Sequence, residues 1–116
     1  VTAGDSGMYL IQLEYLLAGS VSVPALERAW QKYKQEIVFL GIAVSDTEEG
    51  ARETARKYGV TYDLGLDRTN SIALDYRVIG MPSTYFIDKN GIVTKQVSSE
   101  VTEGGMAFFI DLLLQQ

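Results

Sequence analysis

The residue types that most often carry enzyme chemistry are scarce in this chain of 116 residues. It contains no cysteine and no histidine, which excludes thiol nucleophiles, disulfides, Cys/His zinc sites and imidazole bases. Ser20 and Ser22 carry hydroxyls near an expected helix start, but a serine nucleophile needs an adjacent base. Ser22 is therefore interpreted as a helix cap. No EF-hand-like spacing of carboxylates occurs either, so we predict no metal and no cofactor.

Two further polar side chains, Glu14 and Tyr15, follow an apolar stretch. Tyr15 could hydrogen-bond a bound thiol, as in glutathione transferases, but no other feature of a glutathione site accompanies it. Glu14 is interpreted as a carboxylate on the rim of a site, in preference to a buried acid. By themselves these side chains define no catalytic set.

The overall charge and the apolar content restrict the classes of partner. A net charge of −5 and a sequence pI of about 4.6 disfavour binding to nucleic-acid phosphates. Basic residues do cluster, but each cluster lies on an expected helix with glutamates nearby, which is typical of a solvated helix face. These basic residues are Arg28, Lys32, Lys34, Arg52, Arg56 and Lys57.

The length and the hydrophobic content predict one compact domain over residues 1–116. The apolar stretch 8–17 is interrupted by Gln12 and Glu14 and is shorter than the roughly 18 residues expected of a membrane span. We therefore expect no membrane span in this sequence. The start at Val1 is interpreted as that of a trimmed or processed piece, and a targeting segment could have been lost with the missing part.

The spacing of apolar residues predicts the element order β–α–β–α–β–α–β–β–α, in which the first element could be a buried strand or a helix. The expected elements are 8–17, a helix capped by Ser22 with Pro24 in its first turn, a strand over 37–44, a helix with a Ser45/Glu48 capping box, a strand over 62–66, a helix over 72–76, strands over 83–87 and 92–97, and a helix capped by Thr102.

Two of these segments indicate how the sheet is built. Residues 37–44 are nearly all apolar, which is typical of a parallel strand buried on both faces. Asn90-Gly91 is a strong hairpin signal between the last two strands. The pattern predicts an α/β fold, with a mixed central sheet and helices on both of its faces.

Two motifs resemble those of a known family. Residues 80–91 read GMPSTYFIDKNG, within a longer similar segment over 57–93, and residues 23–27 read VPALE. They resemble the TlpA/ResA-like thiol–disulfide oxidoreductases, which have a thioredoxin fold and belong to the redoxin (AhpC/TSA-like) superfamily. The resemblance covers roughly residues 20–115.

The resemblance implies a substrate site around the motif proline. Pro82 is expected to be cis, and Met81, after Gly80, is expected to offer its backbone to an extended polypeptide substrate. Tyr15 takes the position of the family's tryptophan beside that site. The resemblance also implies a periplasmic or otherwise exported protein.

The sequence departs from the family where its redox chemistry resides. The positions that match the family's C-x-x-C are Leu16, Leu17, Ala18 and Gly19, which cannot exchange electrons as a dithiol. We therefore predict a redox-inactive chain. Residues 1–22 as a whole match the family poorly, and segment 8–22 could be natural, frameshifted or engineered.

Three interpretations of function remain open at this point. The chain could be an inert member of the oxidoreductase lineage, or a chaperone-like module that holds extended polypeptide along the Met81–Pro82 edge. It could also self-associate into a homo-oligomer through residues 8–17, if that apolar segment does not complete the core.

Overall fold

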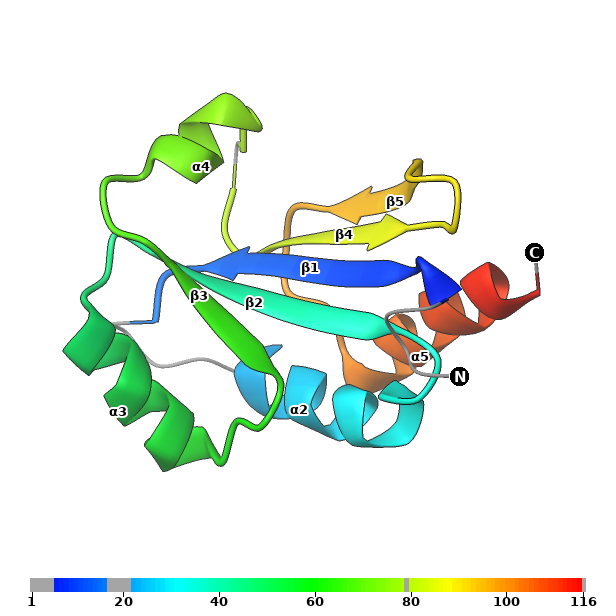
Figure 1. Ribbon diagram of the computed structural model, residues 1–116, viewed down its shortest axis with the longest axis horizontal. Helices are drawn as coiled ribbons and strands as arrows, with labels where there is room; N and C mark the ends of the chain where they lie inside the picture. Colours follow the sequence, from blue (N-terminus) through cyan, green and yellow to red (C-terminus); the bar gives the residue numbers. More distant parts are fainter. Residues whose placement is uncertain (1–5, 17–21, 79, 116) are drawn as a thin grey trace.

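The computed structural model describes residues 6–16, 22–78 and 80–115, and its strands form one mixed sheet (Figure 1). The strand order is β3-β2-β1-β4-β5, in which β4 runs antiparallel to both β1 and β5. The elements are β1 Tyr9–Glu14, α2 Ser22–Tyr33, β2 Val38–Val44, α3 Glu48–Tyr58, β3 Asp63–Asp67, α4 Ser71–Asp75, β4 Ser83–Ile87, β5 Val93–Val97 and α5 Glu103–Leu114. The predicted order and the α/β class are confirmed.

The ambiguous first segment is the central strand, β1. It pairs in parallel with β2, where Tyr9 lies opposite Val38, and antiparallel with β4, where Tyr9 lies opposite Ile87. Both backbone edges of β1 are therefore hydrogen-bonded within the sheet. Pairing with two neighbours overrides the leucine-rich composition, which by itself would equally suit a helix.

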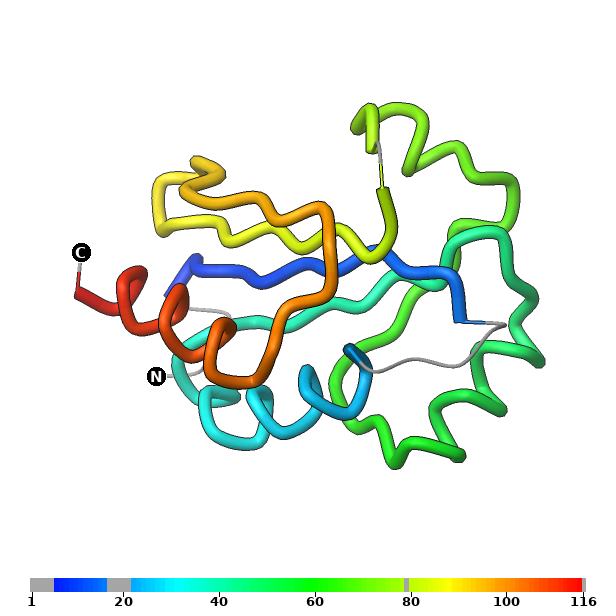
Figure 2. Tube along the Cα trace, turned by 180° about the vertical axis from the view of Figure 1, so that it is seen from behind, coloured from blue at the N-terminus to red at the C-terminus, as the bar shows by residue number. Residues whose placement is uncertain are grey.

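One face of the sheet carries the main core, which α2 and α5 cover (Figure 2). Leu10, Phe39 and Phe86 project from adjacent strands and are at most 1% exposed. Leu26 of α2 and Ile110 of α5 pack against them and are fully buried. Alternation along each strand places these side chains on the same face.

The opposite face is covered less completely, because α4 is a helix of five residues. Leu13, Val44 and Ala73 form a small buried cluster beneath α4. Along β2 the buried and half-buried residues largely alternate, with Leu40 and Ile42 half-buried on this face. Within the described chain α4 covers one end of this face and leaves Leu40 and Ile42 half-buried. The prediction that residues 37–44 are buried on both faces is therefore wrong.

The cap predicted for α3 is also displaced along the chain. Ser45 has a φ of 54° and donates its N–H to the Asp67 carbonyl, so it closes β2 and does not begin the helix. Thr47 is the N-cap, and its hydroxyl accepts from the Gly50 N–H at 3.0 Å. At the other end Gly59 adopts the predicted left-handed conformation, with a φ of 64°.

The C-terminal elements follow the sequence closely. The Asp88 carboxylate accepts from the N–H groups of Asn90 and Ile92, which fixes the predicted hairpin turn. Thr102 caps α5 by accepting from the Gly105 N–H at 3.0 Å. No helix among the described residues has the length and apolar character that a membrane crossing requires.

Candidate functional site

The Met81–Pro82 peptide bond is cis and directly precedes β4, as the family motif predicts. Pro82 is buried and Met81 is half-buried. The Ser83 hydroxyl donates to the Gly80 carbonyl across this turn. Met81 itself lies before the start of β4, so its backbone stands outside the described strand ladder.

A pocket of about 140 Å³ lies beside this turn. It brings together Tyr15, Gly80 and Met81, which are three of the site residues expected from the sequence. Tyr15 follows the end of β1 and is 48% exposed. The structure thus places Tyr15 against the residues that precede the cis-proline.

The far wall of this pocket comes from α4 and the loops around it, which sequence reasoning did not assign to the site. Its residues are Asn70, Ala73, Leu74 and Val78. Leu74 is 68% exposed although it is a large apolar residue. The sequence signal that could have assigned Leu74 to the site was a leucine on the polar face of a short helix just before the G-M-P motif.

The first position matching the family's dithiol has become part of the core. Leu16 is 5% exposed and packs with Val23, Ala43 and Ala51. The other matching positions, 17–19, and Ser20 lie outside the described residues. Leu16 therefore contributes apolar packing at the position that the resemblance matched to a cysteine.

The start of α2 corrects the prediction for Ser22. Ser22 is the first residue of the helix, and its buried hydroxyl has no hydrogen-bond partner in the described structure. The cap interpretation is therefore wrong. Pro24 does lie in the first turn, where its missing N–H costs nothing.

Glu14 is buried and not on a rim, so that interpretation is wrong as well. It is 7% exposed at the end of the central strand. Strand alternation places it on the same face as Leu10 and Gln12, toward the helices of the main core. Gln12 donates to the Thr84 hydroxyl at 3.1 Å, so this face of β1 becomes polar as it approaches the site.

Tyr62 lies near this carboxylate and is 5% exposed. Burial raises the pKa of the Tyr62 phenol, and the negative charges of Glu14 and Glu27 raise it further. An ordinary tyrosine ionises near pH 10, so the folded chain resists ionisation that the unfolded chain undergoes.

We expect this phenol to make stability fall at high pH. The pKa of Tyr62 is raised in the folded state, so the neutral phenol contributes to the free energy of unfolding. This contribution is complete below pH 10, near the pKa of tyrosine in the unfolded chain, and is lost as the pH rises toward the pKa in the folded chain. Above pH 10 the wild-type chain should lose up to about 1.4 kcal/mol per pH unit relative to Tyr62→Phe. Urea unfolding of both proteins across pH 8–11.5 measures the difference, and parallel curves would contradict it.

The motif glutamate Glu27 holds α2 against the loop that precedes β3. Its carboxylate accepts from the Thr61 N–H and from the Thr61 hydroxyl, each at 2.7 Å. Burial opposes ionisation, but these hydrogen bonds and one from Gln31 prevail, and the pKa of Glu27 is lowered. The glutamate of the VPALE motif therefore positions α2 against this loop.

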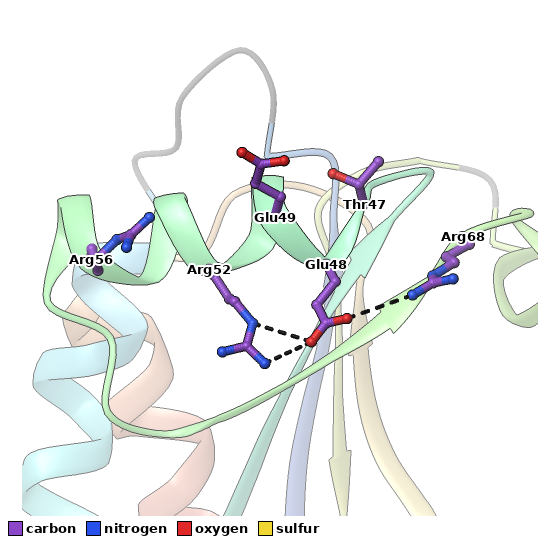
Figure 3. A pocket seen from close by; sticks show the side chains of 6 residues that line it. All are labelled: Thr47, Glu48, Glu49, Arg52, Arg56 and Arg68. Atoms are coloured by element: carbon purple, nitrogen blue, oxygen red, sulfur yellow. Dashed lines mark hydrogen bonds and ion pairs between the residues drawn. The ribbon is translucent and has the colours of Figure 1, made fainter.

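A second surface hollow contains charged side chains (Figure 3). Glu48 lies between two arginines, with Arg52 Nη2 at 2.6 Å and Arg68 Nη2 at 3.9 Å. The hydrogen bond and the charge of Arg52 lower the pKa of Glu48. The arginines are thus engaged with a carboxylate, in agreement with a solvated, ion-paired helix face.

Comparison with known proteins identifies the family. The model of the AhpC/TSA family matches residues 20–96. The chain belongs to the AhpC/TSA family. Among curated proteins, this AhpC/TSA-family chain is 30% identical over 70 residues to the thiol–disulfide oxidoreductase ResA of Geobacillus thermodenitrificans, covering 60% of the chain and 40% of that protein. It is 24% identical over 93 residues to the thioredoxin-like protein YneN of Bacillus subtilis, covering 78% and 54%. The chain therefore spans about half the length of the curated relatives it matches.

Solved structures establish the fold of this AhpC/TSA-family chain as thioredoxin-like. A secreted disulfide oxidoreductase of Mycobacterium tuberculosis superposes with a TM-score of 0.82 at 15% identity, covering 93% of this chain and 83% of that one. A thiol:disulfide interchange protein of Chlorobium tepidum gives a TM-score of 0.80 at 15% identity, covering 97% and 83%. The chain thus shares the fold of these two proteins, and its own sequence contains no cysteine.

Proposed function

We propose that this chain is a redox-inactive thioredoxin-like module that binds extended polypeptide beside Met81 and Pro82. The observation that carries the proposal is the pocket in which Tyr15, Gly80 and Met81 meet the exposed Leu74. A thiol is needed to exchange electrons with a disulfide, and the sequence supplies none.

Main-chain pairing needs no cysteine. Met81 stands just outside the strand ladder, so an extended peptide can align its backbone there and insert a side chain between Tyr15 and Leu74. The hollow of about 140 Å³ suits one side chain of modest size. Binding is therefore expected to be weak and tolerant of sequence.

We expect the reduced and alkylated insulin B chain to bind at this pocket. Amide NMR shifts should move at Tyr15, Gly80 and Met81 in a saturable way. Leu74→Lys should weaken binding about tenfold, because it replaces an apolar contact by a solvated charge. Leu112→Lys, a matched change at a 47% exposed leucine on α5, should leave binding unchanged.

Two results would count against this function. Shifts confined to residues remote from Met81 would contradict the site. Catalysed reduction of insulin by dithiothreitol above the rate of a blank would contradict redox inactivity. Self-association through residues 8–17 was expected only if that segment did not complete the core, and Leu10 and Leu13 are buried in the core. An exported location stays a prediction.

A further inference from the structure

The wall of the pocket beside Met81 contains a carboxamide oxygen that the fold leaves without a donor. Asn70 lies between β3 and α4 and lines the pocket together with Tyr15 and Met81. Its side chain makes no capping bond to α4, and its Oδ1 is buried without a hydrogen-bond partner. A buried carbonyl oxygen without a donor is unfavourable and uncommon in folded proteins, so its presence beside a pocket requires an explanation.

The ordinary role of an asparagine at such a position is filled by another residue. Asn70 stands where a side-chain oxygen commonly accepts from the first N–H groups of a helix. Here the Asp67 carboxylate accepts from the N–H groups of Ile72 and Ala73, at 3.1 and 2.9 Å. The backbone of Asn70 is left-handed, with a φ of 66°, a conformation that asparagine tolerates and glycine adopts without strain. Glycine would serve the backbone equally well, so the carboxamide is available to a ligand.

The described residues that line the pocket supply polar groups but no charge. Tyr15 contributes a phenol and Asn70 a carboxamide, and the other lining residues are apolar. Asn70 is half-buried although its Oδ1 is enclosed, so other atoms of this residue face the pocket. The torsion about its Cβ–Cγ bond has two broad states, and a half-turn exchanges Oδ1 with Nδ2. The wall can therefore present either a hydrogen-bond acceptor or a donor.

We propose that this pocket selects a glutamine or asparagine side chain of the bound polypeptide, which pairs with the Asn70 carboxamide. A ligand carboxamide carries both a donor and an acceptor, so it can form two hydrogen bonds with either orientation of Asn70. The volume of about 140 Å³ admits one such side chain. This inference rests on the proposed peptide binding beside Met81. Main-chain pairing there tolerates many sequences, and Asn70 adds a preference at one position of the peptide.

Charged side chains are disfavoured in the same pocket. A peptide glutamate meets no cationic side chain among the described lining residues, and the chain as a whole has a net charge of −5. A peptide lysine or arginine meets no carboxylate there. Burial of an unpaired charge is more costly than burial of a neutral side chain that is hydrogen-bonded. A peptide with glutamate should therefore bind at least about tenfold more weakly than the same peptide with glutamine.

Two capped heptapeptides that differ only at the central residue test the pairing. They have the sequence Lys-Ala-Ala-X-Ala-Ala-Lys, in which X is glutamine or methionine, and are too short to form a stable helix. Dissociation constants are measured from saturable NMR shifts at Tyr15 and Met81, for the wild-type chain and for Asn70→Gly. The ratio of the methionine constant to the glutamine constant should fall at least about fivefold in Asn70→Gly. Because both peptides are compared on one chain, a general loosening of the pocket cancels in this ratio.

Asn90→Gly is the matched control, since it makes the same change at an exposed asparagine of the β4–β5 turn, and it should leave the ratio unchanged. A ratio in Asn70→Gly that stays within about twofold of the wild-type ratio would overturn the inference. So would binding of the insulin B chain at Tyr15 and Met81 without binding of the glutamine heptapeptide, a result that leaves the proposed function standing. Absence of binding by both heptapeptides and by the B chain would overturn the inference together with the proposed function.

Discussion

Phe86→Ala is expected to lower the free energy of unfolding by about 3–5 kcal/mol, as the removal of a fully buried aromatic side chain commonly does. Phe86 is 0% exposed and projects from β4 into the main core. Its ring lies 5.3 Å from that of Phe109, and Leu10 lies opposite it on β1. Truncation would leave a cavity between the central strands and α5. Urea unfolding followed by circular dichroism measures the loss.

Phe108→Ala is the matched control for this prediction. Phe108 also contacts Phe109, with ring centroids 5.4 Å apart, but it is 59% exposed. We expect a loss within about 0.5 kcal/mol, which is usual for a surface position. Equal losses in the two variants would show that the ring contact with Phe109, and not burial, provides the stability.

The sequence predicted most of the fold because its signals were local. Asn90-Gly91, Gly59 and Thr102 each mark a turn or a helix end through their own backbone or side-chain chemistry, and each is found as predicted. Strand β1 was ambiguous because its identity depends on pairing with β2 and β4, which are distant in the sequence. Once the sheet is assembled, a short apolar segment between two strands can hydrogen-bond its backbone N–H and C=O groups to both neighbours by becoming a strand.

The error over residues 37–44 has its physical origin in layer coverage. Residues 37–44 are apolar enough to be buried on both faces of the sheet. Which face the helices cover, however, depends on the direction in which the chain crosses from one strand to the next. The successive crossovers through α2 and α3 move in one direction across the sheet and lie on the same face. The short α4 is left for the other face, and Leu40 and Ile42 are therefore half-buried.

The candidate site was predictable where it depends on the motif and unpredictable where it depends on α4. Gly80, Met81 and Pro82 are consecutive in a recognisable motif, and Tyr15 was placed by counting back from Val23-Pro24. Leu74 enters the pocket because a short helix is anchored beside the turn. That anchor is a carboxylate that lies between the strand predicted over 62–66 and the helix predicted over 72–76.

Asp67 is this anchor, and it ends β3 with 1% exposure. Its carboxylate accepts from the N–H groups of Ile72 at 3.1 Å and Ala73 at 2.9 Å, the first turn of α4. Asn70 occupies the formal N-cap position but makes no side-chain cap bond. A helix of five residues cannot persist through its own propensity, so α4 depends on this carboxylate.

Asp67→Ala is accordingly expected to cost about 2–3 kcal/mol of unfolding free energy, because two helix N–H groups lose a charged acceptor in a buried position. Asp67→Asn should cost less, since one side-chain oxygen can still accept. Asp75→Ala, at an exposed aspartate of the same helix, should change stability by no more than about 0.5 kcal/mol.

The same variant links the fold to the site. If α4 loosens without Asp67, Leu74 no longer forms a fixed wall opposite Met81. Asp67→Ala should then accelerate hydrogen exchange at the Ala73 amide and weaken insulin B chain binding at least as much as Leu74→Lys does. Normal peptide affinity in an Asp67→Ala chain with fast exchange at Ala73 would show that the pocket works without an ordered α4, and that Met81 and Tyr15 alone provide the binding surface.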